Sequence, residues 1–387
     1  MSDTADRPNV LVTMSDEHDP AVTGCYGDDT VETENIDALA ERGVTFENCY
    51  TNSPLCAPAR LSFTAGQYVS RCGAWSNDCW IPADTRTLPR VLNEAGYESV
   101  LAGKMHYDER RRYGFTELYD GPQNDAHKTG TLGRRAPDDE SVQERSWLAR
   151  SSDFYVGEDA RHFDWDTEVT EEAGRFLRER EPGDDPFFLL AGYIAPHFPL
   201  VAPFEYYRTY HGEVPLPEIP DGFLDDLPTN YEQIRRGFGV TEADHAGDKV
   251  RFGRELYWAF VDWFDDRVGE LLAALDDSAV AENTVVVYTS DHGEDKGDHG
   301  MWWKNCMYDH AARVPLVVSW PGRWTGGERL TEVCSLVDLV ATIADVGGAA
   351  VPDQWDGDSL VGVLDGDADG WKDFAVSEYY AHNTASG

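Results

Sequence analysis

Lysine is nearly absent from this sequence. Only six of its 387 residues are lysine, and 72 acidic side chains outnumber 32 basic ones, which gives a formal net charge of −40. So little positive charge excludes partners that are themselves polyanions, such as nucleic acid and anionic membranes. The acidic residues are spread between apolar segments rather than gathered in a tail, so the composition predicts a folded protein adapted to high salt. Against this background, Lys104 and Lys304 each need a specific reason to be present.

Long hydrophobic runs are also missing. No apolar stretch approaches the ~20 residues that span a bilayer, and the polar segment 1–6 has no signal-peptide pattern. We therefore expect a soluble, cytoplasmic protein. The seven cysteines show no metal-type spacing, which argues against a disulfide framework and leaves one bridge, between Cys72 and Cys79, as an open alternative.

What the sequence does contain is an alternation of short apolar runs with helical periodicity. This alternation predicts an α/β fold with a mostly parallel sheet. We expect strands over 9–15, 97–102, 187–194, 284–289 and 314–319, and helices over 34–42, 87–95, 166–181, 249–275 and 335–346. The stretches 120–157 and 199–248 are poor in pattern, and we interpret them as lid-like insertions in a single domain covering 1–387.

Four of the predicted strands run directly into polar residues, at the end where open parallel sheets bind ligands. The first leads into Asp16-Glu17-His18 and the fourth into Asp291-His292-Gly293. Singly, Asp16 could be a helix cap and Asp291-His292-Gly293 a turn. Together the two aspartates predict a site for a hard divalent cation, which Glu17 and His292 could complete. Histidine makes manganese or magnesium alternatives to calcium.

The segment Cys56-Ala57-Pro58-Ala59-Arg60 is a loop that enters a helix, because proline suits the first helical turn. The Cys56 sulfur would then lie near free backbone N–H groups and the positive helix end, in a pocket that favours an activated thiol or an anion. Positive charge near a dication would come from Arg60 and from four further residues. These are Lys104, His106, His197 and Lys304. Such a pocket suits a multiply charged tetrahedral anion.

Taken together and in their order along the chain, the motifs of this sequence resemble those of the sulfatase family of the alkaline phosphatase superfamily. The resemblance is to the cysteine-type, formylglycine-dependent members, and it is nearest to those like choline-sulfatase and arylsulfatase. The motifs that carry it are Pro8-Asn9-Val10-Leu11 into Asp16, Cys56-Ala57-Pro58-Ala59-Arg60, Gly103-Lys104-Met105-His106, Pro196-His197-Phe198-Pro199, Asp291-His292-Gly293-Glu294 with Lys304, and Arg313-Val314-Pro315. The resemblance implies a large, mostly parallel mixed sheet flanked by helices. It also implies a small C-terminal sheet subdomain, which we expect to be missing or truncated here.

The resemblance implies a role for each site residue. Cys56 would be oxidised to formylglycine by a formylglycine-generating enzyme, and Arg60 would stabilise that group. Asp16, Glu17, Asp291 and His292 would hold one divalent cation, calcium in the first place. Lys104 would bind sulfate, Lys304 and His197 would protonate the leaving oxygen, and His106 would assist breakdown of the sulfated intermediate. Two positions depart from the family pattern: Glu17 stands where many members have aspartate, and His292 stands where asparagine is more common.

The function expected from this reading is metal-dependent hydrolysis of small sulfate monoesters. One alternative is a phosphonate or phosphate ester hydrolase on the same scaffold. The other is an inactive, sulfatase-like ion-binding protein. We expect no nucleic-acid or membrane partner, and the sequence assigns no oligomeric state.

Overall fold

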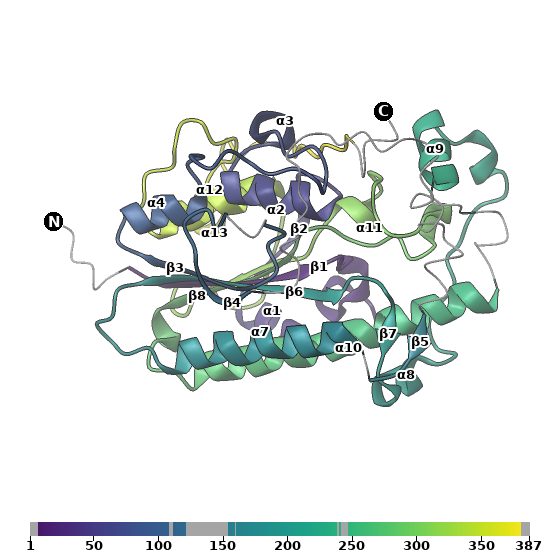
Figure 1. Cartoon of the computed structure of the whole chain (residues 1–387), viewed down its shortest axis with the longest axis horizontal. Helices are drawn as coiled ribbons and strands as arrows, with labels where there is room; N and C mark the ends of the chain where they lie inside the picture. The colour runs from purple at the N-terminus through teal and green to yellow at the C-terminus, as the bar shows by residue number, and fades with distance from the viewer. Residues whose placement is uncertain are drawn as a thin grey trace.

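An eight-stranded sheet forms the centre of the molecule, with helices on both faces (Figure 1). The computed structural model describes residues 7–107, 111–120, 154–158, 160–237, 240 and 247–380. In sheet order the strands are β10 (Glu328–Ser335), β2 (Val44–Tyr50), β9 (Leu316–Ser319), β8 (Thr284–Ser290), β1 (Asn9–Asp16), β6 (Phe187–Pro196), β3 (Glu98–Gly103) and β4 (Thr116–Asp120). Within the described sheet, β9 alone runs antiparallel to its neighbours. The expected mostly parallel, mixed sheet is confirmed.

Two helical layers cover the sheet, and Figure 1 shows one above it and one below. The upper layer contains α2 (Cys56–Ala65), α4 (Leu88–Glu94), α12 (Leu336–Val346) and α13 (Val361–Leu364). The lower layer contains α1 (Glu34–Arg42), α7 (Arg161–Arg178) and α10 (Asp248–Asp276). Shorter elements lie around them: α3 (Val69–Cys72), α8 (Phe204–Tyr210), α9 (Thr229–Gly237), α11 (Asp309–Ala312), and the pair β5 (Tyr155–Val156) and β7 (Val201–Ala202).

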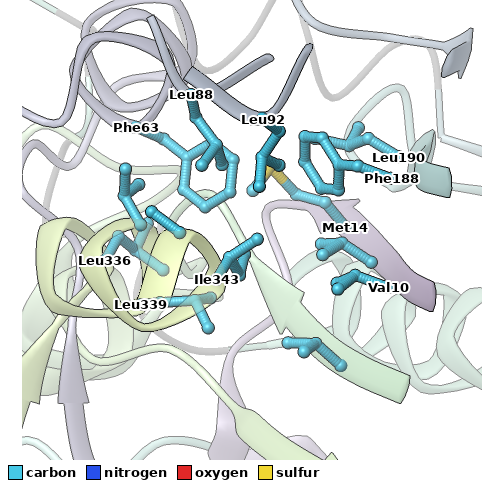
Figure 2. Close-up of a cluster of buried hydrophobic side chains, with 14 of the residues drawn as sticks. Val10, Met14, Phe63, Leu88, Leu92, Phe188, Leu190, Leu336, Leu339 and Ile343 are labelled. Carbon is cyan, nitrogen blue, oxygen red and sulfur yellow. The ribbon is translucent and has the colours of Figure 1, made fainter. Parts of the chain in front are cut away.

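Strand β1 does not alternate between apolar and polar residues, because both of its faces are buried. Val10, Val12 and Met14 face the upper helices, whereas Leu11 belongs to the core beneath the sheet. Figure 2 shows the upper core, in which Val10 and Met14 lie with Phe63 of α2, and the remaining labelled side chains come from α4, β6 and α12. A central parallel strand is buried on both faces, so every position favours an apolar residue.

The expected central strands and most of the expected helices are confirmed to within about two residues of their predicted ends. Helix α7 begins at Arg161, five positions before the prediction, and its added first turn contributes Phe163 to the core beneath the sheet. Strands β2, β4 and β10 were not predicted. Strand β10 is an edge strand with mostly half-exposed or exposed side chains, so its sequence lacks a buried run.

The two pattern-poor stretches have different outcomes. Most of 120–157 lies outside the described residues. The described part of 199–248 contains β7, α8 and α9. Cys72 and Cys79 are both free thiols in the structure. Among the described helices, none combines the length and the apolar character that crossing a bilayer requires.

Candidate active site

The polar strand ends converge, as the sequence predicts. Strand β1 lies between β6 and β8, with Asp16 opposite Pro196 and Ser15 opposite Ser290. Asp291 follows β8 directly and His197 follows β6 directly. The carboxyl ends of these three parallel strands therefore bring Asp16, His197 and Asp291 to one edge of the sheet.

Lys104 reaches this edge because β3 and β6 approach unusually closely at two glycines. The Lys104 N–H donates to the Gly192 carbonyl at 2.7 Å. Gly103 has φ +90°, and a Cβ there would meet the Gly192 oxygen at 2.2 Å. No other residue fits this backbone conformation and this space. The Lys104 ammonium lies 2.5 Å from Asp16 Oδ2.

Helix α2 supplies Cys56 and Arg60, one turn apart. Cys56 is its first residue, and Pro58 lies in the first turn, as expected. The Cys56 Sγ lies 3.1 Å from His292 Nε2 and 3.6 Å from Asp16 Oδ1. The helix therefore presents the sulfur directly to the polar strand ends.

Arg60 is completely buried and organises the site through several donors. Its Nε donates to Asp291 Oδ2 at 2.7 Å, and its Nη2 donates to Asp16 Oδ2 at 3.1 Å. The same guanidinium donates to the carbonyl oxygens of Lys104 and Ser15. Arginine alone has a rigid fork of donors that can satisfy acceptors from this many elements.

A metal ion would fit among four of the buried residues. Ligand atoms of Asp16, Cys56, Asp291 and His292 all lie within 4.8 Å of one another. A second overlapping group of the same kind joins Asp16 with Glu17 and His197. The first group contains three of the four expected metal ligands, Asp16, Asp291 and His292, and the second contains the fourth, Glu17, together with Asp16.

Three of the six lysines each pair with one acidic residue at the end of β1. Lys104 pairs with Asp16, Lys304 with Glu17 at 3.0 Å, and Lys296 with Asp19. All six side chains are buried. A buried charge is costly unless it is paired, so these lysines have a structural reason to persist in a chain that otherwise avoids lysine.

The two expected catalytic histidines differ in their placement. His197 lies with its Nε2 3.4 Å from Glu17 Oε2 and 3.8 Å from Asp16 Oδ1, so it belongs to the converged site. His106 is half-buried, lies two residues beyond Lys104 and has a left-handed φ of 59°. It contributes to neither of the two groups of ligand atoms found among the described residues.

The electrostatics correct one expectation about Cys56. Burial, reinforced by the Asp16 carboxylate, raises the pKa of the Cys56 thiol to about 12 despite the nearby lysines. The expectation of an activated thiol at the helix start is therefore wrong, because desolvation outweighs the helix end and the cations. By contrast, although burial opposes ionisation, Lys104, His197 and Arg60 hold the pKa of Asp16 well below its usual range.

A buried network beside the site was not predicted. Lys296 contacts Asp19, and its Nζ lies 3.2 Å from Asp298 Oδ2 and 3.4 Å from His310 Nδ1. His310 Nδ1 also lies 2.7 Å from Asp19 Oδ2. The rarity of lysine was the signal that could have revealed this network, because Lys296 is as exceptional as Lys104 and Lys304.

Comparison with known proteins identifies the family. A family model described as Sulfatase matches residues 8–349. The chain belongs to the sulfatase family. It is 32% identical over 373 residues to choline-sulfatase of Rhizobium meliloti, covering 94% of this chain and 72% of that protein. It is 30% identical over 396 residues to iduronate 2-sulfatase of Homo sapiens, and the match covers 90% of this chain and 70% of that protein.

Solved structures agree with this sulfatase assignment. A 2-O GAG sulfatase matches with a TM-score of 0.72 and 25% identity, covering 97% of this chain and 78% of that one. The phosphonate monoester hydrolase of Silicibacter pomeroyi shares the fold, with a TM-score of 0.74 at 24% identity. The match covers 96% of this chain and 80% of that one. The expected enzyme class, a sulfuric ester hydrolase, is confirmed at the level of the family.

Proposed function

We propose that this sulfatase hydrolyses sulfate monoesters through a formylglycine nucleophile made from Cys56, beside one bound divalent cation. The observation that carries the proposal is the position of Cys56, whose Sγ lies 3.1 Å from His292 Nε2 and 3.6 Å from Asp16 Oδ1 at the start of α2. A nucleophile there would face a cation site and a group of buried cations at once.

Asp16, Asp291, His292 and residue 56 would hold the cation. Their clustered ligand atoms, two of them carboxylate oxygens, suit calcium, and the imidazole extends the fit to manganese or magnesium. When bound, the ion would polarise the sulfate oxygens and favour the ionised form of the attacking hydroxyl.

The chain's own side chains would perform the remaining work. Lys104 would bind a sulfate oxygen, and Arg60 would hold Asp16 and Asp291 in place beside the nucleophile. His197 Nε2 lies 3.4 Å from Glu17 Oε2 and Lys304 Nζ lies 3.0 Å from Glu17 Oε1, and these two side chains would give a proton to the departing alkoxide oxygen. His106 would assist the elimination of sulfate from the sulfated form of the formylglycine hydrate, whose remaining hydroxyl loses its proton as the aldehyde is regenerated.

Two measurements test this proposal. Mass spectrometry of the Cys56 peptide is expected to find the aldehyde CHO in place of the thiol group CH₂SH. Aryl sulfate hydrolysis by the converted protein is expected to disappear in Cys56→Ala. Unmodified thiol together with no hydrolysis would favour the inactive, ion-binding alternative.

A second candidate is hydrolysis of phosphonate or phosphate esters. The shared fold with phosphonate monoester hydrolase supports it, because the same layout of nucleophile and metal ligands can serve either anion. Parallel assays on an aryl sulfate and on a phenyl phosphonate ester separate the two. A larger kcat/KM for the phosphonate would overturn the assignment to sulfate esters.

A further inference from the structure

We propose that Tyr257 is a positioning residue for the cation site, because its buried hydroxyl bridges two backbone groups of the turn that carries the Glu17 carboxylate. This inference rests on the proposed function for the identity of the bound ion as a divalent cation. The contacts between Tyr257 and the turn are features of the structure itself.

The chain leaves strand β1 through an unusual turn. Glu17, the first residue after the strand, has φ +69°, a left-handed conformation that a residue with a side chain rarely adopts. Successive side chains of an extended strand point to opposite faces, so a straight continuation would direct the Asp16 and Glu17 carboxylates apart. The left-handed residue breaks this alternation, and ligand atoms of Asp16, Glu17 and His197 lie within 4.8 Å of one another.

The Glu17 carboxylate is suited to a cation. Both of its oxygens are buried, and neither has a hydrogen-bond partner in the described part of the chain. Its ion pair with Lys304, at 3.0 Å from Oε1, leaves further lone pairs for a ligand bond. Asp16 also belongs to the group with Cys56, Asp291 and His292, so Glu17 lies beside the other expected ligands of the ion. Its contribution to ion binding therefore depends on the turn that presents it.

The Tyr257 hydroxyl holds this turn with both of its hydrogen-bonding functions. It donates to the Glu17 carbonyl oxygen at 2.7 Å and accepts from the Asp19 N–H at 2.9 Å. One oxygen atom thus joins the Glu17 carbonyl to the N–H group two residues later. A strained backbone persists only where its surroundings over-determine it, and this bridge supplies such a constraint. Because both functions are used on backbone groups, Tyr257 acts through the turn and is not itself a ligand.

Helix α10, in the lower helical layer, sets the position of the hydroxyl (Figure 1). The Tyr257 side chain has no solvent exposure, and it belongs to an apolar cluster that also contains Val22 and Trp302. Residue His18 anchors the turn on its other side, since its N–H donates to Ser290 Oγ at 3.1 Å, at the end of β8. The turn is therefore held between α10 and β8, and loss of the Tyr257 hydroxyl would remove one of these two anchors.

Metal titration tests the proposal without any catalytic assay. Tyr257→Phe keeps the ring and removes only the hydroxyl. In titrations of the full chain with Ca²⁺ or Mn²⁺ alone, we expect this variant to weaken binding by about 10-fold to 100-fold, which is typical when an outer partner of a metal ligand is lost. Binding within about 2-fold of the parent's would overturn the proposal.

Tyr97→Phe is the matched control. The buried Tyr97 hydroxyl also donates to a backbone carbonyl, that of Pro8 at 2.7 Å, but it does so at the opposite end of β1. This variant loses a comparable hydrogen bond, and it should bind either ion within about 2-fold of the parent. Equal weakening in the two variants would indicate a general loosening of the fold and would contradict a role specific to the turn.

A double variant tests whether Tyr257 acts through Glu17. Glycine adopts a positive φ without steric cost, so Glu17→Gly removes both the carboxylate and the need to hold the turn. In this background, Tyr257→Phe is expected to weaken Mn²⁺ binding further by less than about 3-fold. A further loss as large as in the parent background would show that Tyr257 acts elsewhere, against the proposal.

Hydrogen exchange in the metal-free parent needs no variant, so it decides the question even if Tyr257→Phe does not fold. The Asp19 amide should be protected from exchange, because its partner is a buried hydroxyl. Exchange at the rate of an unprotected amide would show that the hydroxyl does not hold the turn, and it would overturn the proposal.

The failure of this inference can be told from failure of the proposed function. A parent protein that binds Ca²⁺ or Mn²⁺ but hydrolyses no sulfate ester would overturn the function, while weaker binding by Tyr257→Phe would still support the positioning role. An active parent whose Tyr257→Phe variant keeps its affinity would overturn this inference alone. A parent that binds neither ion would remove the cation site and this inference with it.

Discussion

Arg60 Nε lies 2.7 Å from Asp291 Oδ2, and both side chains are completely inaccessible to solvent. The same guanidinium contacts Asp16, so one cation on α2 joins the ends of two neighbouring strands, β1 and β8. The polar edge of the sheet is therefore joined by a contact between residues 231 positions apart in the sequence.

The first prediction concerns this contact. Arg60→Met leaves two carboxylates buried beside each other, so we expect it to reduce the free energy of unfolding by about 3–5 kcal/mol. Arg60→Lys should also destabilise the protein, because an ammonium cannot reproduce the planar fork. Urea unfolding provides the measurement. Arg323→Met is the control: it breaks a pair with Asp365 in which both side chains are about two-fifths exposed, and it should cost no more than about 1 kcal/mol. An Arg60→Lys variant as stable as the parent would refute this account.

The second prediction concerns removal of the divalent cation. Asp16 and Asp291 lie in one buried cluster, so a bound dication should stabilise the folded state over the unfolded state. Chelation with EDTA is expected to lower the thermal midpoint of the parent protein. The thermal midpoint of the Asp291→Asn variant should be nearly the same with and without EDTA. Differential scanning calorimetry with and without added Ca²⁺ is the measurement. An identical EDTA shift in both proteins would place the stabilising ion elsewhere.

The third prediction concerns pH. Although burial alone opposes ionisation, Lys296 and His310 hold the pKa of Asp19 below its usual range. A carboxyl group with a lowered folded-state pKa stabilises the protein above its unfolded pKa of about 4, and this stabilisation is lost as the pH falls further through the folded value. Asp19→Asn should therefore be less stable than the parent by about 3–5 kcal/mol near neutral pH, and the gap should narrow below about pH 4.

Urea unfolding from about pH 7 to about pH 3 measures this gap. The exposed residue Asp369 provides a control, since Asp369→Asn should leave the pH profile of stability unchanged. A gap between Asp19→Asn and the parent that stayed constant through the acid range would rule out the ion pair as its source.

The fourth prediction concerns salt. With a formal net charge of −40, repulsion between acidic side chains should destabilise the folded state when the charges are weakly screened. Raising KCl from about 0.1 M to about 3 M shortens the screening length from about 10 Å to below about 3 Å, so the thermal midpoint should rise. The thermal midpoints of EDTA-treated and Ca²⁺-loaded samples should rise by similar amounts. Parallel increases would separate charge screening from binding at the metal site. Indifference to salt would end the high-salt interpretation.

The prediction from sequence was strongest where local pattern and burial coincide. The apolar run of β1 and the run of β8 were recognisable because a central parallel strand is buried on both faces. The edge strand β10 was missed because its half-exposed side chains carry no such signal. The site residues at the strand ends were predictable for a related reason: polar groups directly after a buried run are conspicuous.

The sequence by itself determined the fold class, the family and the approximate position of the site, because these depend on local apolar patterns and on short motifs such as Cys56-Ala57-Pro58-Ala59-Arg60. Only the tertiary structure decided how the charges pair. It assigned Lys104, Lys304 and Lys296 each to a different carboxylate, and it buried the Cys56 sulfur beside Asp16 and His292. Pairing and desolvation depend on distances between segments remote in sequence and on the exclusion of water, and no local pattern contains either quantity.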